Sequence, residues 1–225
     1  HAWGWEPCTI ADIKAYRPEN NSVGSGQVLQ CAYTCEKARL VVREMTDLLA
    51  LDLVEKRLVT DQMILTIGYD IENLTDPVRR KNYKGEVTVD RYGRRIPKHA
   101  HGTVNLDRQT SSSELIIKAV LKLYDEITDK NLLVRRISVT AGRVVSEDCA
   151  GKEKKFEQLE LFTDYAAREK EKREEEEHLQ RERRMQEAVL DIKKKFGKNA
   201  VLKGTNFEEG ATARERNRQI GGHRA

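Results

Sequence analysis

The sequence has little of several features that define common protein classes. Only 6% of its 225 residues are aromatic and 38% are hydrophobic, which is low for one uniform globule of this length. No apolar run approaches the ~20 residues that span a membrane, and the first residues do not have the pattern expected of a signal peptide. A balance of 41 Lys+Arg against 37 Asp+Glu excludes a protein that is strongly basic throughout. We therefore expect a folded domain with part of the chain outside its core.

Cysteine is also scarce. The four cysteines are Cys8, Cys31, Cys35 and Cys149. Their scatter is not a disulfide framework, which favours reduced structural thiols in a cytoplasmic protein. Cys31 and Cys35 together with His99 and His101 make a zinc site on paper, but no second close cysteine pair supports it. Because the first residue is His1 and not Met, we expect the sequence to be part of a longer protein.

Hydrophobic periodicity predicts alternating strands and helices in the first two thirds of the chain. We expect strands at residues 23–31, 62–72, 102–110 and 132–145, and helices at residues 34–56 and 111–129. In the last strand Ile137 and Val139 face one side, and polar residues face the other. Ser111 and Glu114 have capping-box spacing at the start of the second helix.

This order of elements predicts the fold. The sequence strand-helix-strand-strand-helix-strand indicates an α+β class, with a four-stranded antiparallel sheet and two helices on one face. Residues 73–100, between the second and third strands, form a basic insertion in which Tyr92-Gly93 is the turn of a small hairpin. A charged helical C-terminal extension follows the domain.

The chain divides into five parts. They are a short helix and linker at 1–21, the domain at 22–150, a linker with an apolar pentapeptide at 151–163, a charged helix at 164–197 and a flexible tail at 198–225. Thr9 and Asp12 have capping-box spacing in the first part.

Two features outside the core have open interpretations. The polar sheet face, next to a basic insertion, suits a phosphate backbone, but the pattern by itself favours an ordinary solvated face. In the pentapeptide Gln158-Leu159-Glu160-Leu161-Phe162, the apolar side chains can enter a groove of a partner or staple the extension onto the domain.

The extension is dense in charge. Opposite charges four residues apart support a helix without a core. Its second half carries an apolar stripe that we expect to dock onto the domain: Leu179, Met185, Ala188, Val189, Ile192 and Phe196. The arginines of the tail can contact nucleic acid or remain solvated; they are Arg214, Arg216, Arg218 and Arg224.

Together these motifs resemble the C-terminal part of the Y-family translesion DNA polymerases, the DinB/UmuC-like (ImpB/MucB/SamB) family, and within it the Gram-positive bacterial branch. Five segments carry the resemblance: residues 21–27 (NSVGSGQ), 43–45 (REM), 110–115 (TSSSEL), 134–139 (VRRISV) and 158–162 (QLELF). They cover about residues 1–163 in matching order and spacing.

The resemblance implies a little-finger domain at residues 22–150 that lays its sheet along primer-template DNA and contacts phosphates. The matching DNA-binding positions are Ser22, Val23, Gly24, Thr103, Asn105, Arg135, Arg136, Ser138 and Thr140. Residues 1–21 would be the end of the thumb and its linker.

The pentapeptide resembles the family's sliding-clamp-binding motif, Gln-Leu-x-Leu-Phe. The matching positions are Gln158, Leu159, Leu161 and Phe162. The resemblance implies the replicative sliding clamp as a second partner, in a monomeric, cytoplasmic and nucleoid-associated bacterial protein of DNA repair and the SOS response, with no membrane role.

Catalysis is not expected of these residues. The family's catalytic carboxylates hold Mg²⁺ in an N-terminal palm, and nothing in the sequence corresponds to that palm. The aspartates of the domain are scattered over a helix and a strand: Asp47, Asp52, Asp61 and Asp70. We therefore expect no catalytic residue, metal or cofactor here, although the parent resembles a DNA-directed DNA polymerase.

Three functions are compatible with a sequence of this kind. The first is a DNA-binding and clamp-recruiting region of an error-prone translesion polymerase in damage tolerance. The second is a protein–protein adaptor without a DNA-binding role. The third, a small enzyme, is disfavoured because no nucleophile–base pair, phosphate loop or metal cluster has recognisable spacing.

Overall fold

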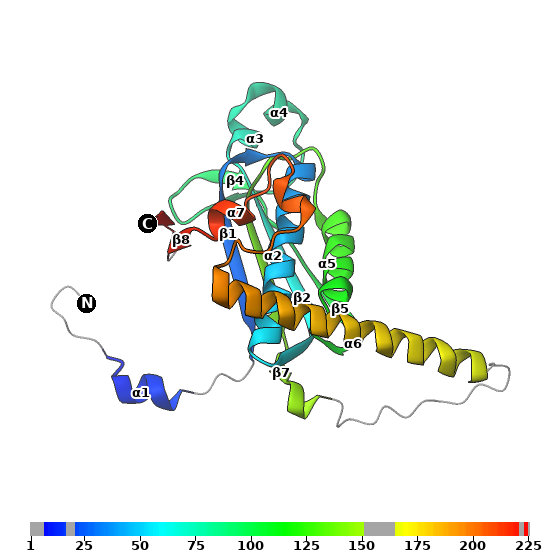
Figure 1. The fold of residues 1–225 in the computed structure, drawn as a ribbon. Coiled ribbons are helices and arrows are strands. Elements are labelled where there is room, and N and C mark those ends of the chain that lie inside the picture. The colour runs from blue at the N-terminus through cyan, green and yellow to red at the C-terminus, as the bar shows by residue number, and fades with distance from the viewer. Residues whose placement is uncertain (1–6, 17–20, 151–164, 221–222, 225) are drawn as a thin grey trace.

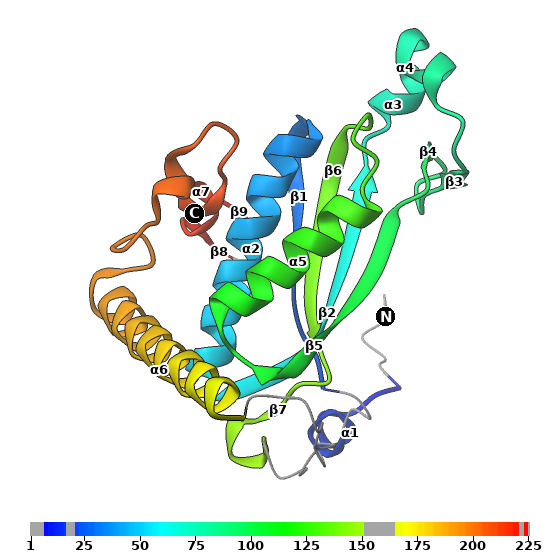
Figure 2. The same ribbon diagram turned by 90° about the vertical axis from the view of Figure 1, so that its right-hand side faces the viewer.

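The computed structural model describes residues 7–16, 21–150, 165–220 and 223–224. Its centre is an antiparallel sheet with two helices on one face (Figures 1 and 2). The main elements are β1 (Val23–Tyr33), α2 (Cys35–Glu55), β2 (Leu58–Tyr69), β5 (Ala100–Thr110), α5 (Ser113–Ile127) and β6 (Val134–Gly142). This confirms the predicted order strand-helix-strand-strand-helix-strand.

The strands lie in the order β1-β6-β2-β5, and each neighbouring pair is antiparallel. A short fifth strand, β7 (Val145–Ser146), pairs with the beginning of β2. The predicted count of four strands is therefore corrected to five. Two residues are too few to show a hydrophobic period, so the sequence carries no signal for β7.

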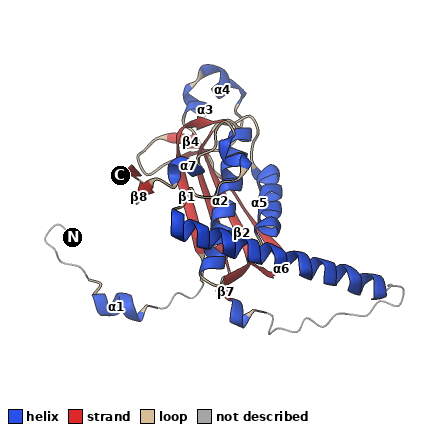
Figure 3. Ribbon diagram, in the orientation of Figure 1, coloured by secondary structure: helices blue, strands red, loops and turns tan. Residues whose placement is uncertain are grey.

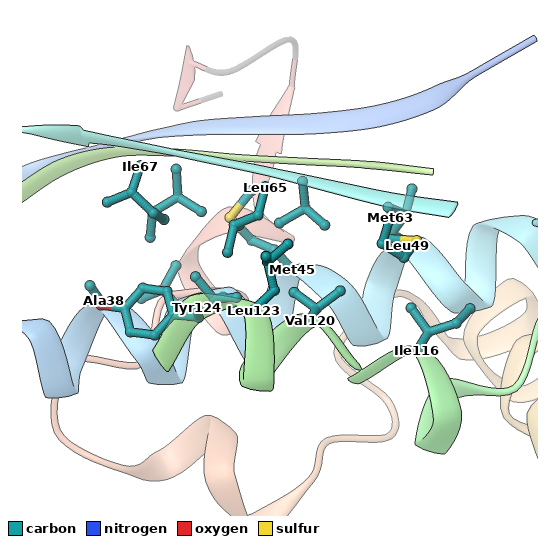
Figure 4. Packing of buried hydrophobic residues seen from close by; sticks show 14 of the residues in the cluster. Ala38, Met45, Leu49, Met63, Leu65, Ile67, Ile116, Val120, Leu123 and Tyr124 are labelled. Carbon is teal, nitrogen blue, oxygen red and sulfur yellow. The ribbon is translucent and has the colours of Figure 1, made fainter. Parts of the chain in front are cut away.

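The hydrophobic core lies between the sheet and the two helices (Figure 4). Met45 and Leu49 of α2 and Val120 of α5 pack against sheet residues such as Leu65 and Ile67, and all five are at most 3% exposed. Each such side chain contributes about 1.5–3 kcal/mol on burial. The core fixes which face of each strand points outward.

Tyr124 is a core residue that the periodicity did not identify. Its ring is fully buried in α5, and its hydroxyl donates to the carbonyl oxygen of Cys35 at 2.7 Å. Burial raises the pKa of Tyr124 above its usual value. The hydrogen bond links the beginning of α2 to α5.

Capping boxes were predicted at the beginning of two helices, and the structure confirms one of them. The capping box before α1 (Ile10–Ala15) is confirmed, because Thr9 Oγ1 accepts from the Asp12 N–H at 3.2 Å and the Asp12 carboxylate accepts from the Thr9 N–H at 2.9 Å. The capping box of Ser111 and Glu114 is wrong. The N-cap of α5 is Ser112, whose Oγ accepts from the Leu115 N–H at 3.2 Å. In a run of serines the spacing alone does not select the capping residue.

The basic insertion contains the predicted hairpin. Strands β3 (Val87–Val89) and β4 (Arg95–Pro97) pair antiparallel, and Gly93 in the turn has φ +77°. Two short helices, α3 (Glu72–Thr75) and α4 (Pro77–Asn82), precede the hairpin and were not predicted. The figures show the insertion beyond one end of the sheet (Figure 2).

The charged extension forms one continuous helix, α6 (Tyr165–Phe196), as Figure 3 shows. Its docked face differs from the predicted apolar stripe: Glu182 and Gln186 are buried, whereas Met185 and Phe196 are 60% and 67% exposed. Val189 and Leu190 are half-buried. The helix docks through polar groups that meet the serine run before α5, which an apolar pattern does not reveal.

The segment after α6 differs from the expected flexible tail. It contains a short 3-10 helix (Gly204–Phe207), α7 (Ala213–Arg216) and the paired strands β8 (Gln219–Ile220) and β9 (His223–Arg224). Glu44 of α2 is 4% exposed and accepts hydrogen bonds from the backbone N–H groups of Thr212 and Ala213. One buried carboxylate thus holds a segment that has few apolar residues.

Candidate nucleic-acid interface

The face of the sheet opposite the helices is polar. Along β6, Ile137 and Val139 are buried while Arg136 is exposed and Ser138 half-buried, because successive side chains of a strand point to opposite faces. On β5 the exposed side chains include Thr103, Asn105 and His101.

The register aligns these residues in rows across the strands. The rows are Gly24, Thr140, Ile64 and Thr103; Gly26, Ser138, Thr66 and His101; and Val28, Arg136 and Gly68. A fourth row contains Gly142, Gln62 and Asn105. The structure therefore brings six of the nine predicted DNA-binding positions onto one surface: Gly24, Thr103, Asn105, Arg136, Ser138 and Thr140.

Three glycines leave parts of this surface without side chains: Gly24, Gly26 and Gly68. A Cβ on Gly24 would lie 2.8 Å from Thr140 Oγ1, and a Cβ on Gly68 would lie 3.1 Å from the Cβ of Arg136. Gly26 has open space at this position, with the Ile137 carbonyl oxygen 4.0 Å away. Glycine in a strand interior weakens the strand, and it is typical of sites where another backbone approaches closely.

One corner of the face is held by hydrogen bonds. Asn105 Oδ1 accepts from Gln62 Nε2 at 3.2 Å and from the Arg143 guanidinium at 2.7 Å. Arg143 also pairs with Asp61 at 2.8 Å. The amide oxygen of Asn105 is therefore engaged by two side chains of the same face.

Arg136 is a second cation on this face, in addition to Arg143. It is exposed, and no hydrogen bond or ion pair joins its guanidinium to another described residue. In the neighbouring row, the Thr66 hydroxyl is hydrogen-bonded to the imidazole Nδ1 of His101 at 2.9 Å. A cation surrounded by hydroxyl groups and glycines has the chemistry that phosphate oxygens require.

Three of the predicted positions lie elsewhere. Val23 packs against the core on the helix side of β1, so only its backbone is available to a ligand. Arg135 donates to the Gln30 carbonyl oxygen at 3.1 Å and lies 3.7 Å from the Asp70 carboxylate. Ser22 precedes β1 and is exposed. Of the two neighbouring arginines, only Arg136 is directed to the open face.

Four residues of the face were not among the predicted site residues: Gln62, Thr66, His101 and Arg143. In the sequence Gln62 and Thr66 alternate with the apolar Met63, Leu65 and Ile67, so a signal for these two positions was present. The sequence carried no signal for Arg143, because this residue follows the end of β6 and has a positive φ of 47°. Residues after a strand end have no period that assigns them to a face.

The structure does not assemble the zinc site. Cys31 lies in β1 and His101 in β5, which are opposite edges of the sheet. The Tyr124 hydroxyl contacts the thiol of Cys35 at 3.3 Å. Among the described residues, no three His, Cys, Asp or Glu side chains are grouped to hold a metal ion. All four cysteines are free thiols.

The four scattered aspartates each have a basic neighbour. Asp47 pairs with Lys203 at 2.6 Å, and Asp52 with Lys56 at 2.8 Å. Asp61 and Asp70 are near Arg143 and Arg135, as described above. Each of the four aspartates is thus accounted for by an ion pair with a separate basic residue.

The predicted clamp-binding pentapeptide, Gln158–Phe162, lies outside the residues that the structure describes. Within the part of the chain that is described, every helix is too short or too polar to traverse a bilayer.

Comparisons with known proteins place this fold in a family. A family model described as the impB/mucB/samB family C-terminal domain matches residues 20–161. Among solved structures, the chain is similar to "Complex of beta-clamp processivity factor and little finger domain of PolIV", at 11% identity and a TM-score of 0.34, over 64% of this chain and 100% of that chain. No curated protein matches the sequence. The family match covers more than half of the chain and confirms the resemblance found in the sequence. The chain therefore belongs to the impB/mucB/samB family, with that family's C-terminal domain at residues 20–161.

Proposed function

We propose that the chain grips primer-template DNA through the open face of its sheet and is recruited to a sliding clamp through Gln158–Phe162. The observation that carries the DNA part is the placement of Arg136 among glycines and hydroxyl groups, with no partner among the described residues. In this role the domain supports translesion synthesis in damage tolerance and is not itself catalytic.

The face suits the DNA backbone better than the bases. Serine, threonine and asparagine side chains donate to phosphate oxygens without reading sequence, and the exposed Arg136 supplies charge. A helix or a two-stranded ribbon enters a major groove readily, whereas a broader sheet with small side chains lies along the phosphates. Contacts of this kind tolerate a damaged base, since they do not depend on base identity.

Salt-dependent binding tests this proposal. We expect the 225-residue chain to bind a primer-template duplex measured by fluorescence anisotropy, with log K falling linearly as log salt rises. Arg136→Ala should weaken binding to different sequences alike and reduce the salt slope by about one. A loss of affinity confined to one DNA sequence, or no binding at low salt, contradicts backbone gripping.

The chain offers a matched control for charge. Lys122 is exposed on α5, on the helix side of the sheet. Lys122→Ala removes one positive charge, as Arg136→Ala does, but from the opposite layer. If both variants lose the same affinity, the effect comes from net charge and not from the sheet face.

The adaptor function is the second candidate. It is favoured by the exposed apolar residues of α6, among them Met185 and Phe196 at 60% and 67%. An adaptor without a DNA role predicts no salt-dependent DNA binding, so the same experiment separates the two functions.

A further inference from the structure

The tip of the β3–β4 hairpin is ordered by one carboxylate. Asp90 Oδ1 accepts from the backbone N–H groups of Tyr92 at 2.8 Å and Arg94 at 2.9 Å, and Oδ2 accepts from Arg94 Nε at 2.8 Å. These hydrogen bonds, the largest from the Arg94 backbone, hold the pKa of Asp90 below its usual value. Gly93 supplies the positive φ that the turn requires. The tip is therefore preorganised before any partner binds.

An aromatic ring is presented at this tip. Tyr92 is 68% exposed, and the guanidinium carbons of Arg91 and Arg94 lie 5.0 and 5.2 Å from its ring centroid. Arg91 also donates to the Tyr92 hydroxyl at 3.0 Å. Each cation–π contact at an exposed site contributes only a small amount of free energy. Such contacts orient the ring, but they do not remove its apolar surface from water.

The charge around the ring is of one sign. Between residues 79 and 98 the sequence has eight Lys or Arg and only two acidic residues, Glu86 and Asp90. Both acids are already paired within the hairpin, Asp90 with Arg94 at 2.7 Å and Glu86 with Lys98 at 2.7 Å. The remaining cations, including the exposed Arg91 and Arg95, leave a positive surface beside Tyr92.

The hairpin adjoins the end of the sheet where Arg136 lies. Strand β4 ends at Pro97 and β5 begins at Ala100, so only two residues separate them. Ala100 pairs with Ile67, and the next residue of β2, Gly68, pairs with Arg136. A DNA strand that follows the open face past Arg136 thus continues toward the hairpin (Figure 2).

We propose that the hairpin tip binds single-stranded DNA that extends from the duplex, with an unpaired base stacked on Tyr92 and phosphates near Arg91 and Arg95. An exposed aromatic ring in a positive groove is the common arrangement for single strands, because every base has a π-face. A paired base hides that face inside the helix. An acidic peptide would satisfy the arginines but gives the exposed ring no role. This inference rests on the proposed DNA-binding function.

Three DNAs test it with the full chain. They are a blunt duplex, the same duplex with a single-stranded 5′ extension, and the extension alone. We expect the wild-type chain to bind the extended duplex about tenfold more tightly than the blunt one, a gain typical of stacking one base. Tyr92→Ala should remove this gain and leave the affinity for the blunt duplex unchanged, whereas Tyr92→Phe should retain it.

A matched aromatic control lies in the C-terminal segment. Phe207 is 63% exposed and has the guanidinium of Arg214 at 4.9 Å, so it resembles Tyr92 in chemistry but not in position. Phe207→Ala should change the affinity for none of the three DNAs.

The outcomes separate this inference from the function on which it rests. If the wild-type chain binds the blunt duplex but gains nothing from the extension, the hairpin assignment is overturned and the sheet function stands. An equal loss on both duplexes in Tyr92→Ala makes the tip a duplex contact, which also overturns it. If no DNA binds at all, the proposed function fails, and the hairpin assignment fails with it.

Discussion

Glu182 of α6 accepts hydrogen bonds from the Ser112 hydroxyl at 2.5 Å and from the Glu114 backbone N–H at 3.0 Å. The extension thus places a carboxylate at the N-terminus of α5, where free N–H groups and the helix dipole favour negative charge. Gln186, one turn later, donates to the Ser111 carbonyl oxygen and the Ser113 hydroxyl. The charged helix is therefore attached by a specific polar contact with the serine run.

Glu182→Ala should detach this part of α6. The substitution leaves the α5 N-terminus without its carboxylate, which costs about 1–2 kcal/mol. We expect a lower urea midpoint and faster amide hydrogen exchange in α6. Glu171→Ala, on an exposed position of the same helix, is the control and should change neither. Equal exchange rates in the two variants would contradict a docking role for Glu182.

The buried carboxylate of Glu44 should hold the C-terminal segment. Glu44→Ala leaves the N–H groups of Thr212 and Ala213 without their acceptor, at a cost of about 1–3 kcal/mol. We expect faster trypsin cleavage after Lys203 and Arg214, with the far-ultraviolet circular dichroism of the domain largely retained.

Glu126 provides the control for this experiment, since it is an exposed acidic residue of α5. Glu126→Ala should leave the rate of cleavage at both sites as in the wild type. A Glu44→Ala protein with wild-type cleavage rates would show that other contacts hold the segment.

The buried Glu44 and Glu182 show which contacts could not be predicted from the sequence. Periodicity identified the strands and their faces well, because Ile137 and Val139 alternate with polar residues in a sheet that has one buried side. It succeeded only in part for α6, where Leu179 and Val189 of the predicted stripe are half-buried but Met185 and Phe196 are exposed. An apolar pattern cannot indicate a helix that docks through a buried glutamate and glutamine.

The candidate site shows the same limit. Six of the nine positions implied by the resemblance share the open face, since strand alternation fixes them. Arg135 and Arg136 are neighbours of the same type, and alternation with the buried Ile137 and Val139 places Arg136 on the open face. The hairpin turn was predictable from Tyr92-Gly93, but the cation–π contacts around the ring were not.

The pair of Arg39 and Asp125 predicts a pH dependence of stability. Arg39 donates to both carboxylate oxygens, at 2.8 and 2.9 Å, and this hydrogen bonding holds the pKa of Asp125 below its usual value. A lowered pKa stabilises the fold above the ordinary aspartate pKa of about 3.9, and the contribution is lost as pH falls through the lowered pKa. The two side chains are 44% and 48% exposed, so the contribution is only about 0.5–1 kcal/mol.

Arg39→Gln should therefore lower the urea midpoint at pH ~7, and its effect should shrink as the pH falls through the lowered pKa of Asp125. Arg43→Gln is the control, because Arg43 is exposed on the same helix and has no ion pair with a described residue. A destabilisation by Arg39→Gln that does not change as the pH falls would assign its effect to packing of the arginine and not to charge.

Substitutions in the pentapeptide Gln158–Phe162 should abolish binding to the sliding clamp and leave binding to DNA unchanged. Leu161→Ala combined with Phe162→Ala removes two large apolar side chains, which supply most of the binding energy in short peptide motifs. We expect this variant to lose capture by immobilised sliding clamp and to bind primer-template DNA with unchanged affinity. Glu160→Ala, at the variable position of the motif, should retain capture. Persistent capture of the double variant would show that this pentapeptide is not the recruiting motif.

Gly26 allows the effects on stability and on DNA binding to be separated. A side chain at this position meets open space, so Gly26→Val removes backbone freedom from the unfolded chain and should stabilise the fold by about 0.5–1 kcal/mol. The same side chain would stand on the open face in the row of Ser138 and Thr66 and hold a DNA backbone away from them. We expect a higher urea midpoint together with weaker DNA binding by anisotropy. Because a destabilised variant loses both properties together, a more stable protein that binds DNA less tightly identifies a steric block on the open face. If Gly26→Val binds DNA as tightly as the wild type, the DNA does not pack closely against β1, and the contact surface begins at β6.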